Sequence, residues 1–285
     1  MRLTDMDGTI GVEVSDVDLS DSNGVDPRWT ADDLQGLRAA LDERHLLLVR
    51  GAVLSGEAQV GFAARFGPLV PERSLWGYVS NSRPDGIIRT GPLLFHSDFA
   101  FTAHPVSCIS LHALEASPGG IPTVWADAVA AVDRLPADLR RRLEGLQVCN
   151  CFDMLGEGDH RMRLAEIDPR SPRAVHPVLG RHPRTGATVL MANAMHTDSI
   201  VGVPEAESEA LLTDLFAVLY DESYLYEHHW SVGDLVLWDN IALQHARGEV
   251  GADVPRTLQR VTVGEFTPGE LVPGLAELLA EKHAR

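Results

Sequence analysis

Short apolar runs of strand length alternate with helix-like segments through the first third of this 285-residue chain. Residues 9–19 alternate loosely between apolar and polar side chains, and residues 46–51 form an apolar run that ends in glycine, so both segments are predicted to be strands. Thr30 precedes an acidic first turn and should cap a helix that ends near residue 43. A second helix is predicted over 56–65, before a Gly-Pro pair.

The rest of the chain continues this succession of short strands and inserted helices. The predicted elements are strands over 106–114, 235–239 and 257–265, a turn followed by a strand over 119–127, a hairpin at 184–186, two short helices divided by Pro136, and helices over 205–219 and 273–283. Residues 69–94 show no period, so we predict an irregular loop there, with a lid near 70–94. We therefore predict one domain over 1–285, mainly β with helices (α+β), built as a β-sandwich or jelly roll with its helices outside.

Composition changes this picture mainly by exclusion. Hydrophobic residues make up 45% of the chain, enough for a large core. The net charge of −17 argues against nucleic acid and acidic membranes as partners, because both need a positive surface. The N-terminus lacks the apolar segment of a signal peptide, and no run approaches the ~18 apolar residues of a membrane span. We expect a cytoplasmic protein whose oligomeric state is open, a homo-oligomer included.

The three cysteines do not suggest a metal or disulfide framework. Cys108, Cys149 and Cys151 are too few for a set of disulfides, which agrees with a reducing compartment. Cys149-Asn150-Cys151 resembles half of a metal clip, but soft-metal sites usually need four ligands and no second cysteine pair exists. Buried thiols are the better interpretation.

A histidine two residues before an aspartate occurs twice, as His96-Ser97-Asp98 and as His196-Thr197-Asp198, so this spacing alone is weak. The first pair lies among three phenylalanines, and the second lies where a turn is as plausible as a strand. On a strand, side chains two residues apart point the same way. A carboxylate and an imidazole buried among aromatic rings need a partner, such as a metal. We therefore favour the first pair as ligands.

A third candidate ligand lies near the end of the chain. His245 closes the segment Trp238-Asp239-Asn240-Ile241-Ala242-Leu243-Gln244-His245. With His96 and Asp98 it would complete a two-histidine, one-carboxylate face, which binds Fe(II) and leaves three positions open for a co-substrate and O₂. The sequence therefore predicts a site for oxygen chemistry.

Two arginines follow this histidine in a strand-like segment. Arg256 and Arg260 flank Leu258, so both guanidinium groups can face one cavity and bind carboxylates with two-pronged geometry. The alternative is a pair of exposed arginines on an edge strand, which the neighbouring metal motif makes less attractive.

Together these residues resemble the taurine dioxygenase-like, Fe(II)- and 2-oxoglutarate-dependent oxygenases. The resemblance covers nearly the whole chain, in matching order and spacing. Its pieces are residues 46–51, Phe66-Gly67-Pro68-Leu69, His96 with Asp98, Gly119-Gly120-Ile121-Pro122-Thr123, Asn193 with Thr197, Ile200-Val201-Gly202, and residues 233–240 leading to His245.

The resemblance implies a double-stranded β-helix, a cupin-like jelly roll, that binds Fe(II), 2-oxoglutarate and O₂. By position, His96, Asp98 and His245 match the iron ligands, and Thr123 and Arg256 match the holders of the distal carboxylate of 2-oxoglutarate. Arg260 matches a position that grips the anionic end of the substrate, and His196 replaces an aromatic residue of the substrate pocket. Ile241 departs from a common arginine with little effect on the chemistry.

The implied reaction is oxidation, preferably hydroxylation, of an unactivated C–H bond in a small molecule, with release of succinate and CO₂. Asp98 favours hydroxylation, because halogenating relatives lack this carboxylate. The substrate suggested by Arg260 is a carboxylate, sulfonate or phosphonate.

Two alternatives remain. A cupin-like isomerase or binding module could use the same ligands without 2-oxoglutarate, although Arg256 and Thr123 would then have no task. Asp5-Met6-Asp7-Gly8-Thr9 resembles the nucleophile motif of haloacid dehalogenase-type phosphatases, but that motif needs a buried apolar strand before it, and Met1-Arg2-Leu3-Thr4 is too short and polar.

Overall fold

Two sheets form the centre of the structure. The computed structural model describes residues 1–21, 23, 26, 28–71, 74–87, 90–154, 160–251 and 253–274. The larger sheet has seven strands in the order β1 (Arg2–Asp5), β2 (Val12–Ser15), β3 (Leu46–Val49), β14 (Leu235–Asp239), β6 (Cys108–Glu115), β16 (Thr257–Val263) and β4 (Gly77–Ser80). The smaller has four, in the order β13 (Tyr226–His228), β7 (Thr123–Asp127), β15 (Leu243–Arg247) and β5 (Leu93–His96). Within these two sheets the pairing is antiparallel except between β2 and β3.

The two sheets pack face to face through one apolar cluster. It joins Ile109 and Trp238 of the seven-stranded sheet to Trp125 and Leu243 of the four-stranded sheet, and all four side chains are buried. The predicted sandwich is therefore confirmed, and strands from both sheets line one cavity between them.

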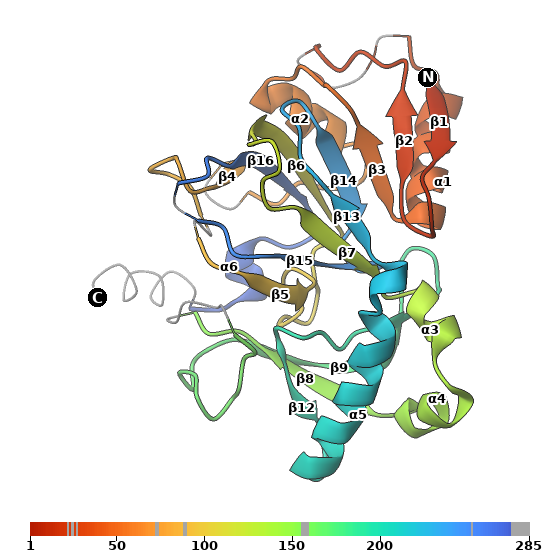
Figure 1. The fold of residues 1–285 in the computed structure, drawn as a ribbon, viewed down its shortest axis with the longest axis vertical. Coiled ribbons are helices and arrows are strands. Elements are labelled where there is room, and N and C mark those ends of the chain that lie inside the picture. The colour runs from red at the N-terminus through yellow and green to blue at the C-terminus, as the bar shows by residue number, and fades with distance from the viewer. Residues whose placement is uncertain are drawn as a thin grey trace.

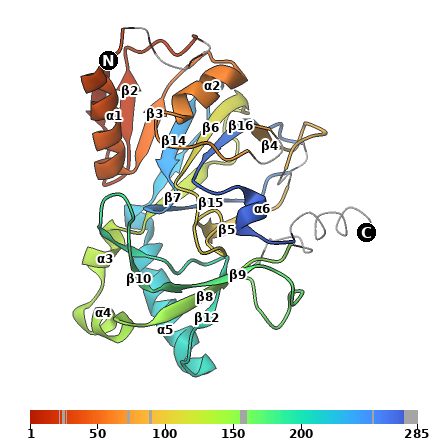
Figure 2. The same ribbon diagram turned by 180° about the vertical axis from the view of Figure 1, so that it is seen from behind.

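The uninterrupted apolar run of β3 has a simple physical cause. Leu46 and Leu48 face the cluster between the sheets, whereas Leu47 and Val49 face the opposite side, where α1 (Ala31–Arg44) and α2 (Gly56–Ala63) cover the sheet. Figures 1 and 2 both show α1 beside β1, β2 and β3. Thr30 caps α1, because its side chain accepts a hydrogen bond from the backbone of Asp33 and the Asp33 carboxylate accepts one in return.

A second layer of structure lies below the four-stranded sheet in Figure 1. It consists of a three-stranded sheet, a hairpin, three helices and a helical turn: β8 (Gln147–Cys151), β9 (Arg173–Pro177), β12 (Thr197–Ile200), β10 (Leu179–Arg181), β11 (Thr188–Leu190), α3 (Ala130–Arg134), α4 (Ala137–Leu143), α5 (Glu205–Leu219) and η1 (Glu222–Tyr224). The predicted hairpin, the two helices divided by Pro136 and the helix over 205–219 are thus confirmed.

Some predictions about the secondary structure were wrong. The stretch 69–94 is not irregular throughout, because β4 lies within it and β5 begins at Leu93. β4 is a four-residue edge strand with an exposed glycine, so it lacks the apolar alternation that reveals longer strands. β1 was also missed, since all four of its residues are exposed. The predicted C-terminal helix lies largely outside the described residues, which instead end with α6 (Pro268–Leu271).

Among the described residues, none of the helices combines the length and apolar character that crossing a membrane requires.

Candidate active site

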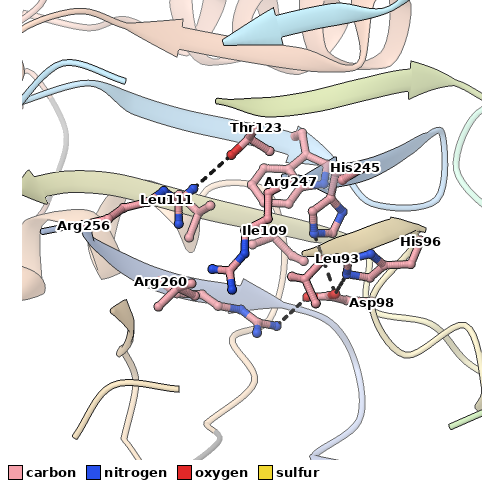
Figure 3. Close-up of a pocket in the computed structure, with 13 residues that line it drawn as sticks. Leu93, His96, Asp98, Ile109, Leu111, Thr123, His245, Arg247, Arg256 and Arg260 are labelled. Atoms are coloured by element: carbon pink, nitrogen blue, oxygen red, sulfur yellow. Dashed lines mark hydrogen bonds and ion pairs between the residues drawn. The ribbon is translucent and has the colours of Figure 1, made fainter. Parts of the chain in front are cut away.

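The antiparallel pairing of β5 with β15 brings two histidines together. His245 is the register partner of His96, and their ring centroids lie 4.2 Å apart. The Asp98 carboxylate completes the group: its Oδ1 lies 3.2 Å from His96 Nε2 and 3.9 Å from His245 Nε2. One ligand atom from each residue lies within 4.8 Å of the other two (Figure 3).

The sequence pattern predicted that Asp98 would lie on the same strand as His96, but it does not. β5 ends at His96, and Asp98 belongs to the turn that follows, where Phe99 has a left-handed φ of 61°. Asn240 holds this turn by accepting a hydrogen bond from Asp98 N at 2.9 Å and donating one to Asp98 O at 3.0 Å. The Trp-Asp-Asn segment thus fixes the carboxylate through its backbone.

Ring nitrogens of both histidines in this group can act as metal ligands. His96 Nδ1 lies 2.7 Å from Leu94 O, a contact that assigns the ring proton to Nδ1 and leaves the Nε2 lone pair facing Asp98. Burial, and then the neighbouring His96, lowers the pKa of His245 to about 3, so its ring is neutral. Nitrogen atoms of two imidazoles and an oxygen of one carboxylate converge here, and a cation between them would bind to all three. This donor set fits Fe(II).

Arg260 lies directly against the carboxylate of this group. Its Nη2 is 2.8 Å from Asp98 Oδ2, the oxygen that does not face the histidines. Burial of Asp98 opposes ionisation, but the positive charge of Arg260 outweighs it and holds the pKa of Asp98 well below its usual range. The Asp98 carboxylate is therefore ionised, with one oxygen held by Arg260 and the other facing the histidines.

The other end of the same cavity has a cationic wall. Arg256 precedes β16 and is buried, and its Nη2 donates to Thr123 Oγ1 at 3.1 Å. Burial, and then the nearby Arg247, lowers the pKa of Arg256 to about 9. Within the part of the chain that the structure describes, Arg256 Nε and Nη1 have no hydrogen-bond partner. A buried guanidinium whose N–H groups have no hydrogen-bond partner is suited to bind an anion.

Arg247 is a third guanidinium in this cavity that the sequence reasoning missed. It lies two residues after His245 on β15, opposite Thr123 on β7, and its side chain is buried. Its Nη2 donates to the carbonyl oxygens of Thr90 and Gly91 at 3.2 Å each, and burial lowers its pKa to about 10. The two-residue spacing from His245 was the available signal, because it places both side chains on one face of a strand.

The cavity encloses about 460 Å³ of space not occupied by atoms, part of which is open to solvent. Figure 3 shows Arg247 reaching into it from β15, with Arg256 and Arg260 on either side in this view. Apolar side chains of Leu93, Ile109 and Leu111 form much of the remaining lining. The site therefore combines a metal-ligand cluster, three guanidinium groups and an apolar wall.

The second histidine–aspartate pair does not form a comparable cluster. His196 is buried, and its ring lies 5.6 Å from that of His96 and 5.2 Å from that of Phe101. Burial lowers the pKa of His196 well below its ordinary value. Asp198 instead accepts a hydrogen bond from Leu164 N at 3.0 Å. His196 thus lies beside the metal-ligand cluster as a neutral ring, and the described residues place no acidic side chain with it as a ligand pair.

The phosphatase alternative finds no support in the structure. Asp5 lies at the end of β1, an exposed edge strand of the seven-stranded sheet, and it does not line the cavity. The motif needs a buried strand that aims its first aspartate into a pocket, so this alternative is wrong.

Comparisons with known proteins agree with the geometry. A family model described as "Taurine catabolism dioxygenase TauD, TfdA family" matches residues 2–262. The chain is 30% identical over 275 residues to an alpha-ketoglutarate-dependent 2,4-dichlorophenoxyacetate dioxygenase of Cupriavidus pinatubonensis, with 87% of this chain and 92% of the relative covered. It is 33% identical to an (S)-phenoxypropionate/alpha-ketoglutarate-dioxygenase of Sphingobium herbicidovorans, covering 84% of this chain and 86% of that protein.

Among solved structures, a taurine dioxygenase from Burkholderia xenovorans superposes with a TM-score of 0.73. It is 26% identical in sequence, and the match covers 93% of this chain and 91% of that one. The predicted jelly roll is thus confirmed.

Proposed function

This chain belongs to the TauD/TfdA family of dioxygenases, and we propose that it is an Fe(II)- and 2-oxoglutarate-dependent enzyme that hydroxylates an unactivated C–H bond of a small anionic metabolite. One O₂ and one 2-oxoglutarate are consumed for each hydroxylated product, succinate and CO₂ formed. The observation that carries the proposal is the joint presence, in one cavity, of the His96, Asp98 and His245 ligand atoms and of a buried cationic wall. A cupin-like protein without 2-oxoglutarate would have no use for that wall.

His96, Asp98 and His245 would hold the iron, and Arg260 would keep the Asp98 carboxylate ionised and turned toward the histidines. When bound, iron and 2-oxoglutarate supply the activation of O₂ that C–H oxidation requires. The protein contributes orientation. The contact between His96 and the Leu94 carbonyl fixes one imidazole, and Asn240 fixes the turn that carries Asp98.

Arg256 and Thr123 would bind the distal carboxylate of 2-oxoglutarate. Arg256 is buried, keeps two nitrogen donors without a hydrogen-bond partner among the described residues, and already contacts the Thr123 hydroxyl. A carboxylate placed there receives charge-assisted hydrogen bonds from a buried guanidinium. Binding would thus compensate for the burial of Arg256.

Charge counting supports an anionic substrate. Arg247, Arg256 and Arg260 bring three positive charges to the cavity, and among the described residues that line it Asp98 is the one acid. Adding Fe(II) and dianionic 2-oxoglutarate leaves the site cationic, although the whole chain carries a net charge of −17. A small anion is therefore attracted to this site rather than to the rest of the surface.

We propose that Arg260 and Arg247 bind the anionic group of the substrate. His196 would contact the substrate beside the iron. The two relatives named above are, by their names, enzymes of aryloxy carboxylic acids. The aromatic surroundings of His196, with Phe101 and Phe152 at 5.2 and 5.7 Å, favour a substrate with an apolar body. Carboxylates, sulfonates and phosphonates all meet the charge requirement.

The decisive experiment is an aerobic screen with Fe(II) and 2-oxoglutarate. The panel holds aryloxyacetates, alkyl sulfates, sulfonates and phosphonates, together with an amide analogue of each carboxylate. Succinate and the mass of each substrate are followed in the same reactions. For at least one anion and for none of the amides, we expect stoichiometric succinate together with an oxidised product. That product is one oxygen heavier than the substrate or, where the hydroxylated carbon bears the ether or ester oxygen, consists of the carbonyl compound and the released phenol or sulfate. Substrate turnover independent of 2-oxoglutarate would contradict the proposal.

Three further expectations from the sequence accompany this proposal and stay predictions. They are a single domain, a lid near residues 70–94 and a cytoplasmic location. Free thiols at Cys108, Cys149 and Cys151 support a reducing compartment. The contacts of Arg247 with the carbonyls of Thr90 and Gly91 support a coupling between the cavity and the segment before β5.

Gel filtration would decide whether the protein is a homo-oligomer.

A further inference from the structure

Two N–H donors converge on the hydroxyl of Thr123 at the arginine-lined end of the cavity. Trp230 Nε1 donates to Thr123 Oγ1 at 2.9 Å, and Arg256 Nη2 donates to the same oxygen at 3.1 Å. Indole and guanidinium groups are donors only, and a hydroxyl oxygen has two acceptor lone pairs. The protein therefore uses both acceptor positions of Thr123.

The hydroxyl hydrogen of Thr123 must then point in the remaining direction. Thr123 is 3% exposed and lines the cavity, and its hydroxyl has no contact in the described part of the chain besides these two. A buried hydroxyl hydrogen needs an acceptor. Since both neighbours are donors, that acceptor comes from whatever occupies the cavity, water or a bound ligand.

The indole of Trp230 is held firmly in this position. β13 pairs with β7 so that His228 is the register partner of Thr123, and Trp230 follows β13 by two residues. The indole packs edge-on against the ring of His228 at 4.6 Å, and His228 in turn contacts Asp234 at 3.1 Å and Tyr226 at 2.9 Å. Trp230 is buried, so its N–H direction is set by packing rather than by solvent.

We propose that Trp230 is a positioning residue for 2-oxoglutarate: by occupying one lone pair of Thr123, it fixes the hydroxyl as a donor aimed at the distal carboxylate. The inference rests on the proposed function and deepens it. Without the indole N–H, the hydroxyl is free to rotate and to turn a lone pair toward the carboxylate, which is repulsive. Trp230 thus favours a ligand that presents a hydrogen-bond acceptor to Thr123, although the indole does not contact the ligand itself.

The test is a double-mutant cycle read by binding. Calorimetric titration of 2-oxoglutarate into the Mn(II)-loaded protein measures affinity without turnover. Trp230→Phe should weaken binding by about 3- to 10-fold, the size expected for one net hydrogen bond. In a Thr123→Val background the same change should cost less than about twofold, because the hydroxyl that Trp230 orients is gone. Thr123→Ser, which keeps a hydroxyl, should restore the dependence on Trp230.

Trp125→Phe is the matched control. Trp125 is also fully buried, but its indole nitrogen has no hydrogen-bond partner among the described residues, so losing this N–H should leave 2-oxoglutarate affinity unchanged. Equal losses for Trp230→Phe in both Thr123 backgrounds, or no loss in the parent protein, would overturn the assignment of Trp230. Failure of the parent protein to bind 2-oxoglutarate at all would overturn the proposed function with it.

A second readout needs no change at Trp230. The chain has five tryptophans, so its indole N–H groups give few NMR signals. The signal of Trp230 should move on Thr123→Val, which removes its acceptor, and stay near its place on Thr123→Ser. An unchanged signal in Thr123→Val would contradict the hydrogen bond itself.

Discussion

Replacing Arg256 with methionine should make the metal-free protein more stable while it nearly abolishes 2-oxoglutarate binding. Burial, and then the nearby Arg247, lowers the pKa of Arg256 from 12.5 to about 9. At ~1.4 kcal/mol per pKa unit, this corresponds to a cost of roughly 5 kcal/mol for keeping the folded side chain charged. Because the folded pKa lies below the unfolded one, the full cost applies at every pH below about 9, and therefore at pH 7.

Only part of this cost is recovered on substitution. A cavity relaxes around its charge, and replacing buried charged groups with apolar ones of similar volume typically gains about 1–4 kcal/mol. The Thr123 hydroxyl also loses a donor in the variant, at a cost of about 1 kcal/mol. We therefore expect Arg256→Met to raise the free energy of unfolding by about 1–2 kcal/mol.

The same substitution removes the cation that the distal carboxylate would meet. Loss of one partner of a buried charge pair costs about 2–5 kcal/mol, which weakens binding roughly 30-fold to several thousand-fold. Urea unfolding of the metal-free protein at pH 7 and calorimetric titration of 2-oxoglutarate into the Mn(II)-loaded protein measure the two effects separately.

Arg161→Met is the control for stability. Arg161 contacts the Glu209 carboxylate at 2.8 Å and the Thr197 carbonyl at 2.8 Å, outside the cavity. Its loss leaves polar partners without a donor and should destabilise the protein, while 2-oxoglutarate affinity stays the same. The reasoning is refuted if Arg256→Met destabilises the metal-free protein as Arg161→Met does, or if its 2-oxoglutarate affinity stays within about threefold of the parent's.

Three further predictions concern the same cavity. Alanine at any of the three proposed iron ligands, His96, Asp98 or His245, should abolish the visible charge-transfer band of the anaerobic protein with Fe(II) and 2-oxoglutarate, whereas His196→Ala should keep it; retention of the band in all three ligand variants would end the metal assignment. Arg260→Ala should lower substrate affinity and form succinate in excess over product, with Arg260→Lys recovering only part of the loss; full coupling with an unchanged substrate KM would remove Arg260 from the substrate site. Arg247→Gln should raise the KM of an anionic substrate about tenfold or more, and move 2-oxoglutarate affinity less; the reverse order would place Arg247 in the co-substrate clamp.

Much of the fold and most of the proposed site could be predicted before the structure. Capping and helix-ending residues located α1 and α2, and apolar runs located most central strands, because these strands bury almost every side chain. These signals failed for β1 and β4, which are short edge strands with little to bury. Their existence depends on hydrogen bonds to a neighbour that is distant in sequence, as when β4 pairs with β16.

The residue types and spacings of His96, Asp98 and His245 determined the candidate chemistry, because a metal selects donor atoms and few side chains provide them. Only the tertiary structure decided how those donors meet: Asp98 leaves the strand and is held in a turn by Asn240, 142 residues away. It also decided which side chains act through a neighbour. Arg247 reaches the cavity because β15 lies between β7 and β5, and Trp230 reaches the Thr123 hydroxyl because β13 adds to the same sheet. Such roles depend on contacts between strands that are distant in sequence: the spacing from His245 indicates which way Arg247 faces, but not which residues it meets.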